Sequence, residues 1–324
     1  MALLEVRTLK TYFFTGRGII KAVDEVSFEV EKGKVLGIFG ESGGGKSVTA
    51  LSILGLVPSP GRITGGQIMF KGRNLTQASK QAMRSIRGNE IAMIFQDPMT
   101  SLTPFFTIGN QIVEAIQQHR EVSKGEANEI AIHMLKIANL PEPETLLRVY
   151  PFQLSGGMRQ RAMIAMALSC SPDLLLADEP TTALDVTTQA QIMLEMRELQ
   201  KRLGMAVIII THDLGVISEL ADEVIVMYAG QVMERAPVET LVHHPGHPYT
   251  KALVKSVPTL KTAHDRLEPI PGLPPDLLDL PIGCPFRPRC PYAQIACEED
   301  KPQLTAFASG HWIACHFARR LTDL

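Results

Sequence analysis

The feature that most constrains the fold is a glycine-rich segment at residues 40–47, which reads Gly-Glu-Ser-Gly-Gly-Gly-Lys-Ser. It matches the pattern G-x-x-x-x-G-K-[ST] and lies between an apolar run at 35–39 and a helix-like pattern at 47–56. Glycines let backbone N–H groups converge on phosphates, and the N-terminus of a helix adds a favourable dipole. The segment therefore predicts a phosphate loop between a strand and a helix.

The rest of the first 255 residues indicates an α/β core. Apolar runs at 91–95, 174–177 and 206–210 alternate with helix-period segments at 107–138, 159–168 and 189–203. Two short runs at 224–227 and 231–234 flank Ala229-Gly230 and predict a hairpin. Residues 58–66 hold two prolines and three glycines and predict a loop. A proline-rich stretch after about residue 256 predicts a separate C-terminal extension.

Composition narrows the class of protein. The net charge of −2 gives no electrostatic reason to expect a nucleic-acid partner. No apolar run approaches the roughly 18–20 residues that a membrane span needs, and no signal peptide is apparent. We therefore expect an intracellular chain that relies on other subunits if it serves a membrane process.

Polar residues at predicted strand ends fit the chemistry of phosphoryl transfer. In the loop, Lys46 is expected to pair with the β- and γ-phosphates and Ser47 to hold Mg²⁺. Asp178 and Glu179 follow the run at 174–177, so Asp178 can reach Mg²⁺ and Glu179 can polarise the attacking water as general base. Gln96 follows the run at 91–95 and can reach the same metal and water.

A second glycine motif, Leu-Ser-Gly-Gly-Met-Arg-Gln-Arg at 154–161, constrains the assembly. Ser155, Gly156 and Gly157 precede a helix that begins near Met158, which makes another anion site. The alternative is a serine that only caps its helix. One ATP cannot fill both glycine motifs if the helical region at 107–138 separates them.

These motifs together resemble the ABC (ATP-binding-cassette) ATPases, and the resemblance covers residues 1–255. It implies an α/β, RecA-like P-loop NTPase fold with an antiparallel β subdomain and an inserted helical subdomain at about 97–158. A Cys/Pro-rich extension follows at 256–324.

The resemblance also assigns residues to roles. His212 would sense the γ-phosphate, Gln96 would belong to the Q-loop, and residues 182–185, ending in Asp185, would form the D-loop. Phe13 would stack on adenine, with Tyr12 as the alternative. The ATP-binding set is Phe13, Gly40, Glu41, Ser42, Gly43, Gly44, Gly45, Lys46, Ser47 and Val48; the signature set, acting on the partner's ATP, is Ser155, Gly156, Gly157 and Gln160.

Finer features resemble the dipeptide/oligopeptide importer branch: residues 95–102, 181–185, 247–253 and the cysteine-containing tail. This resemblance implies peptide import powered by ATP hydrolysis at the cytoplasmic face of the cell membrane. The implied partners are a second ATPase subunit, identical or paralogous, two membrane-spanning permease subunits and an extracytoplasmic peptide-binding protein. Importers of nickel or sugars in the same branch, a soluble ABC ATPase of DNA repair or translation, and a small-molecule kinase are the alternatives.

The tail carries four of the five cysteines, Cys284, Cys290, Cys297 and Cys315, with the spacing C-x5-C-x6-C-x17-C. Four thiolates can bind Zn²⁺ or a [4Fe–4S] cluster. Zinc sites favour closely spaced pairs, which the tail lacks, and some members of this branch carry a cluster. We therefore expect an iron–sulfur cluster, with zinc or free thiols as alternatives. Cys170 is expected to be a buried small residue.

Overall fold

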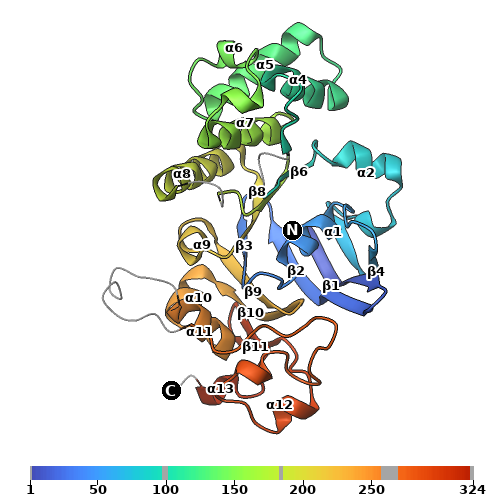
Figure 1. Cartoon of the computed structure of the whole chain (residues 1–324), viewed down its shortest axis with the longest axis vertical. Helices are drawn as coiled ribbons and strands as arrows, with labels where there is room; N and C mark the ends of the chain where they lie inside the picture. The colour runs from blue at the N-terminus through green and yellow to red at the C-terminus, as the bar shows by residue number, and fades with distance from the viewer. Residues whose placement is uncertain (1, 97–100, 182–184, 257–268, 322–324) are drawn as a thin grey trace. The chain divides into compact units, whose positions relative to one another are not determined.

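The computed structural model describes residues 2–96, 101–181, 185–256 and 269–321 (Figure 1). The chain divides into two compact units. The first unit holds residues 31–34 and 77–209, and the second holds residues 2–30, 35–76 and the chain from 210 onward. Each unit is described by itself below.

An antiparallel sheet occupies the N-terminal part of the second unit. Its strands are β1 (Ala2–Thr15), β2 (Gly18–Glu31), β4 (Gly61–Phe70) and β5 (Arg73–Asn74), in the order β2-β1-β4-β5. β1 and β4 are antiparallel, with Leu4 opposite Phe70, and both side chains are fully buried. Residues at the end of β5 continue into the short turn η1 (Leu75–Gln77).

The phosphate-loop segment follows a strand of a different sheet in the same unit. β3 (Val35–Phe39) is buried at every residue and pairs in parallel with β9 (Glu223–Tyr228). The loop then leads into α1 (Lys46–Ile53), and α9 (Leu214–Leu220) packs near β3. β9 and β10 (Gln231–Pro237) are antiparallel and confirm the predicted hairpin.

The C-terminal region extends this second sheet. β12 (His311–Ile313) pairs with β10 and with β11 (Thr305–Ala308). The remaining elements are α10 (Val238–His243), α11 (Pro248–Lys255), η3 (Arg287–Arg289), α12 (Ala296–Glu299) and α13 (Ala318–Leu321). A buried hydrogen bond anchors the region, because His311 Nε2 lies 2.7 Å from the carboxylate of Glu234 on β10.

The first unit holds a group of packed helices, drawn in green in Figure 1: α4 (Ile108–His119), α5 (Lys124–Ile137), α6 (Pro143–Leu146) and α7 (Gly156–Leu168). The predicted helical segment at 107–138 is two helices because Ser123 starts a new one. Its hydroxyl accepts from Glu126 N–H while the Glu126 carboxylate accepts from Ser123 N–H, which is a capping box.

The parallel strands of this unit are β6 (Ile91–Ile94) and β7 (Leu174–Asp178), which pair from Ile91 opposite Leu174 to Ile94 opposite Ala177. The other elements are α2 (Lys80–Ile86), η2 (Pro151–Gln153), α8 (Val186–Leu203) and β8 (Ala206–Thr211), whose last residues pass into the second unit. Across the described residues, none of the helices combines the length and the apolar character needed to cross a bilayer.

One segment differs from its prediction. Residues 58–66 were expected to form a loop, but β4 begins at Gly61. A Cβ on Gly61 would lie 2.6 Å from Cε1 of Phe13, so only glycine lets the Phe13 ring pack against the facing strand. Glycine here therefore serves close packing within a strand.

Candidate nucleotide site

The loop at 40–47 has backbone geometry that requires glycine. Gly40 and Gly45 adopt φ values of +147° and +95°. A Cβ on either would lie 2.2 Å from a backbone oxygen, that of Met227 for Gly40 and that of Ala22 for Gly45. The fold around the loop thus accepts no side chain at these positions.

Lys46 lies at the start of α1 and is 5% exposed. Its ammonium donates to the carbonyls of Gly40, at 2.8 Å, and Glu41, at 2.9 Å, so the side chain lies back along the loop. Ser47 and Val48 follow in the first turn, while Ser42 and Gly43 at the tip are exposed. The residues predicted to bind phosphate are therefore gathered around one helix N-terminus, where anions are favoured.

Two residues outside the predicted set also hold this loop. The N–H of Glu41 donates to the hydroxyl of Tyr249 at 2.9 Å. The carboxylate of Glu41 pairs with the guanidinium of Arg289 from the C-terminal region. Both residues lie in segments that resemble the importer branch, at 247–253 and in the cysteine-containing tail, but neither was predicted to have a role at the phosphate loop.

The first unit brings two predicted catalytic residues together. Gln96 follows β6, and its side-chain amide donates to Glu179 Oε2 at 3.0 Å. Asp178 ends β7 and is buried, while Glu179 lies just beyond it with a φ of +45°. A left-handed conformation is uncommon for a non-glycine residue and is often found at functional sites. It lets the chain turn sharply after the buried strand.

The signature motif begins a helix in the same unit. Ser155 is the exposed N-cap of α7, and its hydroxyl accepts from Met158 N–H at 3.3 Å. A Cβ on Gly157 would lie 3.1 Å from Cγ2 of Thr188, so α7 and α8 approach closely there. Gln160 is buried, and within the described part of the chain its Nε2 has no hydrogen-bond partner.

Other predicted residues have simpler surroundings. Asp185 is exposed and caps α8 by accepting from Thr188 N–H at 3.0 Å; residues 182–184 of the predicted D-loop lie outside the described residues. His212 is exposed just after β8.

Phe13 packs against Gly61, whereas Tyr12 donates its hydroxyl to Asp24 at 2.6 Å. The stacking of Phe13 on adenine, with Tyr12 as the alternative, stays a prediction.

The four cysteines of the tail line one small cavity, of about 10 Å³, together with His247 and Phe286. Burial raises the pKa of Cys284 and of Cys290 to about 11. Among the described residues, however, no three His, Cys, Asp or Glu side chains form a group that could hold a metal ion. The described residues thus show no metal-binding arrangement, and the iron–sulfur cluster stays a prediction. Cys170 is buried, as predicted.

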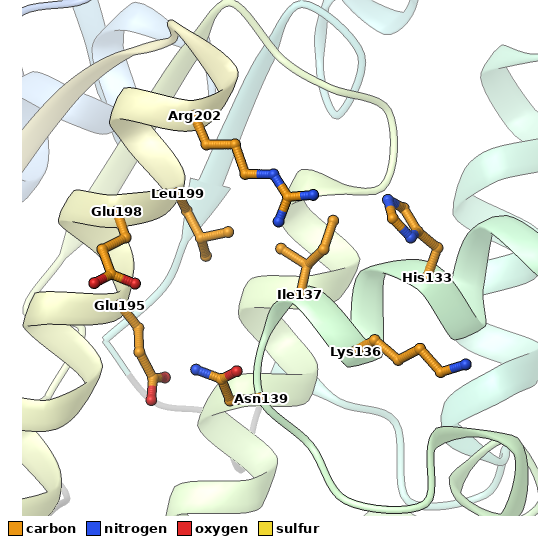
Figure 2. Close-up of a pocket in the computed structure, with 8 residues that line it drawn as sticks. All are labelled: His133, Lys136, Ile137, Asn139, Glu195, Glu198, Leu199 and Arg202. Carbon is orange, nitrogen blue, oxygen red and sulfur yellow. The ribbon is translucent and has the colours of Figure 1, made fainter.

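A larger hollow of about 340 Å³ lies between α5 and α8 and contains none of the predicted site residues (Figure 2). Its walls carry charges of both signs, with Lys136 on α5 and Glu195, Glu198 and Arg202 on α8. Glu195 is already paired with Arg161 of α7. This hollow therefore has the character of a charged surface groove between packed helices.

Known proteins resemble both parts of the chain. Residues 23–182 match the family model "ABC transporter", and residues 233–297 match "Oligopeptide/dipeptide transporter, C-terminal region". A probable peptide ABC transporter ATP-binding protein, y4tR of Sinorhizobium fredii, is 52% identical, covering 99% of this chain and 97% of its own length. The dipeptide transport ATP-binding protein DppD of Escherichia coli is 48% identical, covering 98% and 97%.

Solved structures agree. The dimeric post-hydrolysis state of the ATP-binding cassette MJ0796, bound to ADP and Pi, aligns with a TM-score of 0.66 at 29% identity, covering 72% of this chain and 98% of its own. The predicted α/β nucleotide-binding fold is thereby confirmed. The chain belongs to the ATP-binding proteins of ABC transporters, in the group that carries the oligopeptide/dipeptide transporter C-terminal region.

Proposed function

We propose that this chain hydrolyses ATP to power the import of di- and oligopeptides through membrane subunits. The observation that carries the proposal is its similarity, over nearly the whole chain, to ATP-binding proteins named for dipeptide and oligopeptide transport, at 48% identity to DppD of Escherichia coli and OppD of Salmonella typhimurium. The alternative cargo within the same branch is nickel or a sugar. The proposed location is the cytoplasmic face of the membrane, where such subunits act.

The reaction is the transfer of the γ-phosphoryl group of ATP to water. The loop amides and Lys46 bind the phosphates, and the charge that develops in transfer is stabilised at the N-terminus of α1. Ser47, Asp178 and Gln96 offer a hydroxyl, a carboxylate and an amide oxygen, which are the hard ligands that Mg²⁺ prefers. Bound Mg²⁺ would neutralise phosphate charge.

Glu179 acts as the general base in this proposal. It takes one proton from water as the water oxygen attacks the γ-phosphorus, and ADP leaves with the bridging oxygen. The 3.0 Å hydrogen bond from Gln96 supports this role, because it holds the carboxylate in one orientation without neutralising it. His212 would contact the γ-phosphate and respond to its loss.

A second ATPase subunit completes each site. We assign Ser155, Gly156, Gly157 and Gln160 to the ATP of the partner, which is a second copy or a paralogue, with Asp185 at the interface. The exposure of Ser155 and Gly156 at a helix N-terminus supports this assignment. So does the resemblance to cassettes that were solved as dimers. The chain alone should then bind ATP but hydrolyse it slowly.

An apolar groove of about 550 Å³ in the first unit suits a membrane partner. Its lining includes Met93, Phe95, Met163 and Met166, and Phe95 is 41% exposed. Methionine-rich surfaces adapt to the apolar face of a partner helix. Because Gln96 directly follows Phe95, occupation of the groove would act on the residue that holds Glu179. We propose that a cytoplasmic helix of a permease subunit docks here.

The cargo can be tested through ATPase stimulation. The complete assembly would be reconstituted with its extracytoplasmic binding protein, which is loaded in turn with a dipeptide, with nickel and with a sugar. Stimulation of ATP hydrolysis by the dipeptide alone supports peptide import. Stimulation by nickel alone or by the sugar alone would instead assign the chain to the nickel or sugar importers of this branch.

For the cysteine site we retain a [4Fe–4S] cluster as a proposal, with zinc and free thiols as alternatives. Its support is the convergence of four thiols, Cys284, Cys290, Cys297 and Cys315, on one cavity. Thiolates are the ligands of such clusters, and bound iron would offset the burial that now favours the protonated thiols. Iron and sulfide analysis of anaerobically purified protein tests it: near-zero iron and zinc would leave free thiols.

A further inference from the structure

The phosphate loop contains an acidic residue, Glu41, next to the backbone that is proposed to bind a polyphosphate. A carboxylate in an anion-binding loop opposes binding by like-charge repulsion unless a cation neutralises it. We propose that Arg289 is a positioning residue that neutralises Glu41, and that the C-terminal region thereby sets the affinity of the chain for ATP. This inference rests on the proposed role of residues 40–47 in binding ATP.

The contact between the two side chains is bidentate. Arg289 Nη1 donates to Glu41 Oε2 at 2.6 Å, and Nη2 donates to Oε1 at 3.0 Å. Both oxygens of the carboxylate are thus engaged by one guanidinium, which is the strongest arrangement for this pair of groups. The pair spans 248 positions of the sequence and lies within the second unit.

Arg289 is fixed by contacts other than Glu41. Its side chain is 3% exposed, and its Nε donates to the carbonyl of Pro271 at 3.0 Å. Nη2 also donates to the carbonyl of Ile270 and Nη1 to the hydroxyl of Tyr228, both at 3.3 Å. The guanidinium therefore holds the loop from a rigid position. Glu41, with 26% of its side chain exposed, is the partner that can move.

An aromatic cluster makes a second connection between the C-terminal region and the phosphate loop, in addition to the Arg289–Glu41 pair. The rings of Tyr228, Tyr249 and Phe286 lie with centroids 4.6–5.5 Å apart. Tyr249 accepts the N–H of Glu41 at 2.9 Å, so the backbone and the side chain of Glu41 are both held by residues beyond 227. Cys290, which lines the cysteine cavity, directly follows Arg289.

The test measures ATP affinity by titration of the full-length chain with a fluorescent ATP analogue. Arg289→Met keeps the bulk of the side chain and removes the charge. It should raise the dissociation constant of ATP by roughly 5–150-fold, the usual range for coupling between sites. The double variant Arg289→Met/Glu41→Gln also removes the uncompensated carboxylate and should recover most of that loss. Adenosine, which carries no phosphate, should bind Arg289→Met as it binds wild type.

A matched control lies in the same short turn. Arg287 carries the same charge two residues away and forms a 3.8 Å ion pair with the exposed Glu298 in place of Glu41, so Arg287→Met should leave ATP affinity unchanged. All titrations would be run well below the melting temperature of the least stable variant. Unchanged ATP affinity in Arg289→Met, or a double variant that binds no better than Arg289→Met, would overturn the inference. A separate variant tests whether residues 40–47 bind ATP at all. If they do not, Lys46→Ala would bind ATP like wild type.

Discussion

The side-chain amide of Gln96 donates a 3.0 Å hydrogen bond to Oε2 of Glu179, which joins the ends of two neighbouring parallel strands. Glu179 adopts a left-handed backbone conformation one residue after the buried Asp178. The hydrogen bond fixes the Glu179 carboxylate beside Gln96, which directly follows Phe95 of the apolar groove. Several tests of the proposed chemistry depend on this pair.

Glu179→Gln should leave ATP binding intact and reduce turnover by roughly 10²–10⁴, the range for a lost general base. The amide keeps the shape of the side chain but cannot accept the proton of water. Turnover would be measured by phosphate release from the complete assembly, with the exposed Glu129→Gln on α5 as control. Wild-type turnover in Glu179→Gln would show that Glu179 is not the general base.

Gln96→Glu should shift the acidic limb of the pH–rate profile to higher pH. It replaces a donor 3.0 Å from Glu179 with a second carboxylate, and like charges at that distance raise the pKa of the pair. The general base would then need a higher pH to be deprotonated. Gln96→Ala, which adds no charge, is the control. An unchanged limb in Gln96→Glu would mean that the two side chains are apart during turnover.

Two substitutions at Ser155 separate helix capping from anion binding. Ser155→Ala loses the cap on α7 and should cost about 1 kcal/mol of stability. Ser155→Asp keeps a good cap but places a negative charge where the partner's phosphates are proposed to bind, so it should abolish ATP hydrolysis while leaving the melting temperature near that of wild type. Full activity in Ser155→Asp would leave capping as the only role of this residue.

His247 makes stability depend on pH. Burial lowers its pKa to about 4, against an ordinary value of 6.5, while the nearby Glu234 acts in the opposite direction. The unfolded chain therefore binds a proton below pH 6.5 when the folded chain does not. The stabilising contribution is complete above pH 6.5 and is lost as the pH falls towards 4, by roughly 3 kcal/mol in all.

His247→Asn should flatten this dependence, because asparagine can cap α11 as His247 does but does not titrate. Urea unfolding across this pH range would show it, with the exposed His243→Asn as control. A wild-type slope in His247→Asn would assign the acid sensitivity to other groups.

Much of the fold could be predicted because its signals are local. The run before the phosphate loop became β3, and the turn at Ala229-Gly230 joins β9 to β10. The exception, β4 starting at Gly61, arose because the glycine packs against Phe13, 48 positions away, and a turn-like composition cannot reveal such a partner.

The residues proposed for the site were marked by local signals. Lys46 lies in the glycine-rich segment, and Gln96 and Glu179 follow apolar runs, so motifs could single them out while their roles stay predictions. Nothing local marks Arg289 as the partner of Glu41, because the pair depends on how distant segments fold together. The spacing of the cysteines likewise suggested convergence, and they do line one cavity, but spacing alone did not yield a metal-binding arrangement.

The most direct test of the account is uptake of a labelled dipeptide into vesicles that contain the complete assembly. ATP is supplied on the side that holds this subunit. The account predicts ATP-dependent accumulation with the wild-type chain, and no accumulation with Lys46→Ala or Glu179→Gln in otherwise identical vesicles. Equal uptake with wild type and both variants, or no uptake of any di- or oligopeptide by an assembly that hydrolyses ATP, would contradict it.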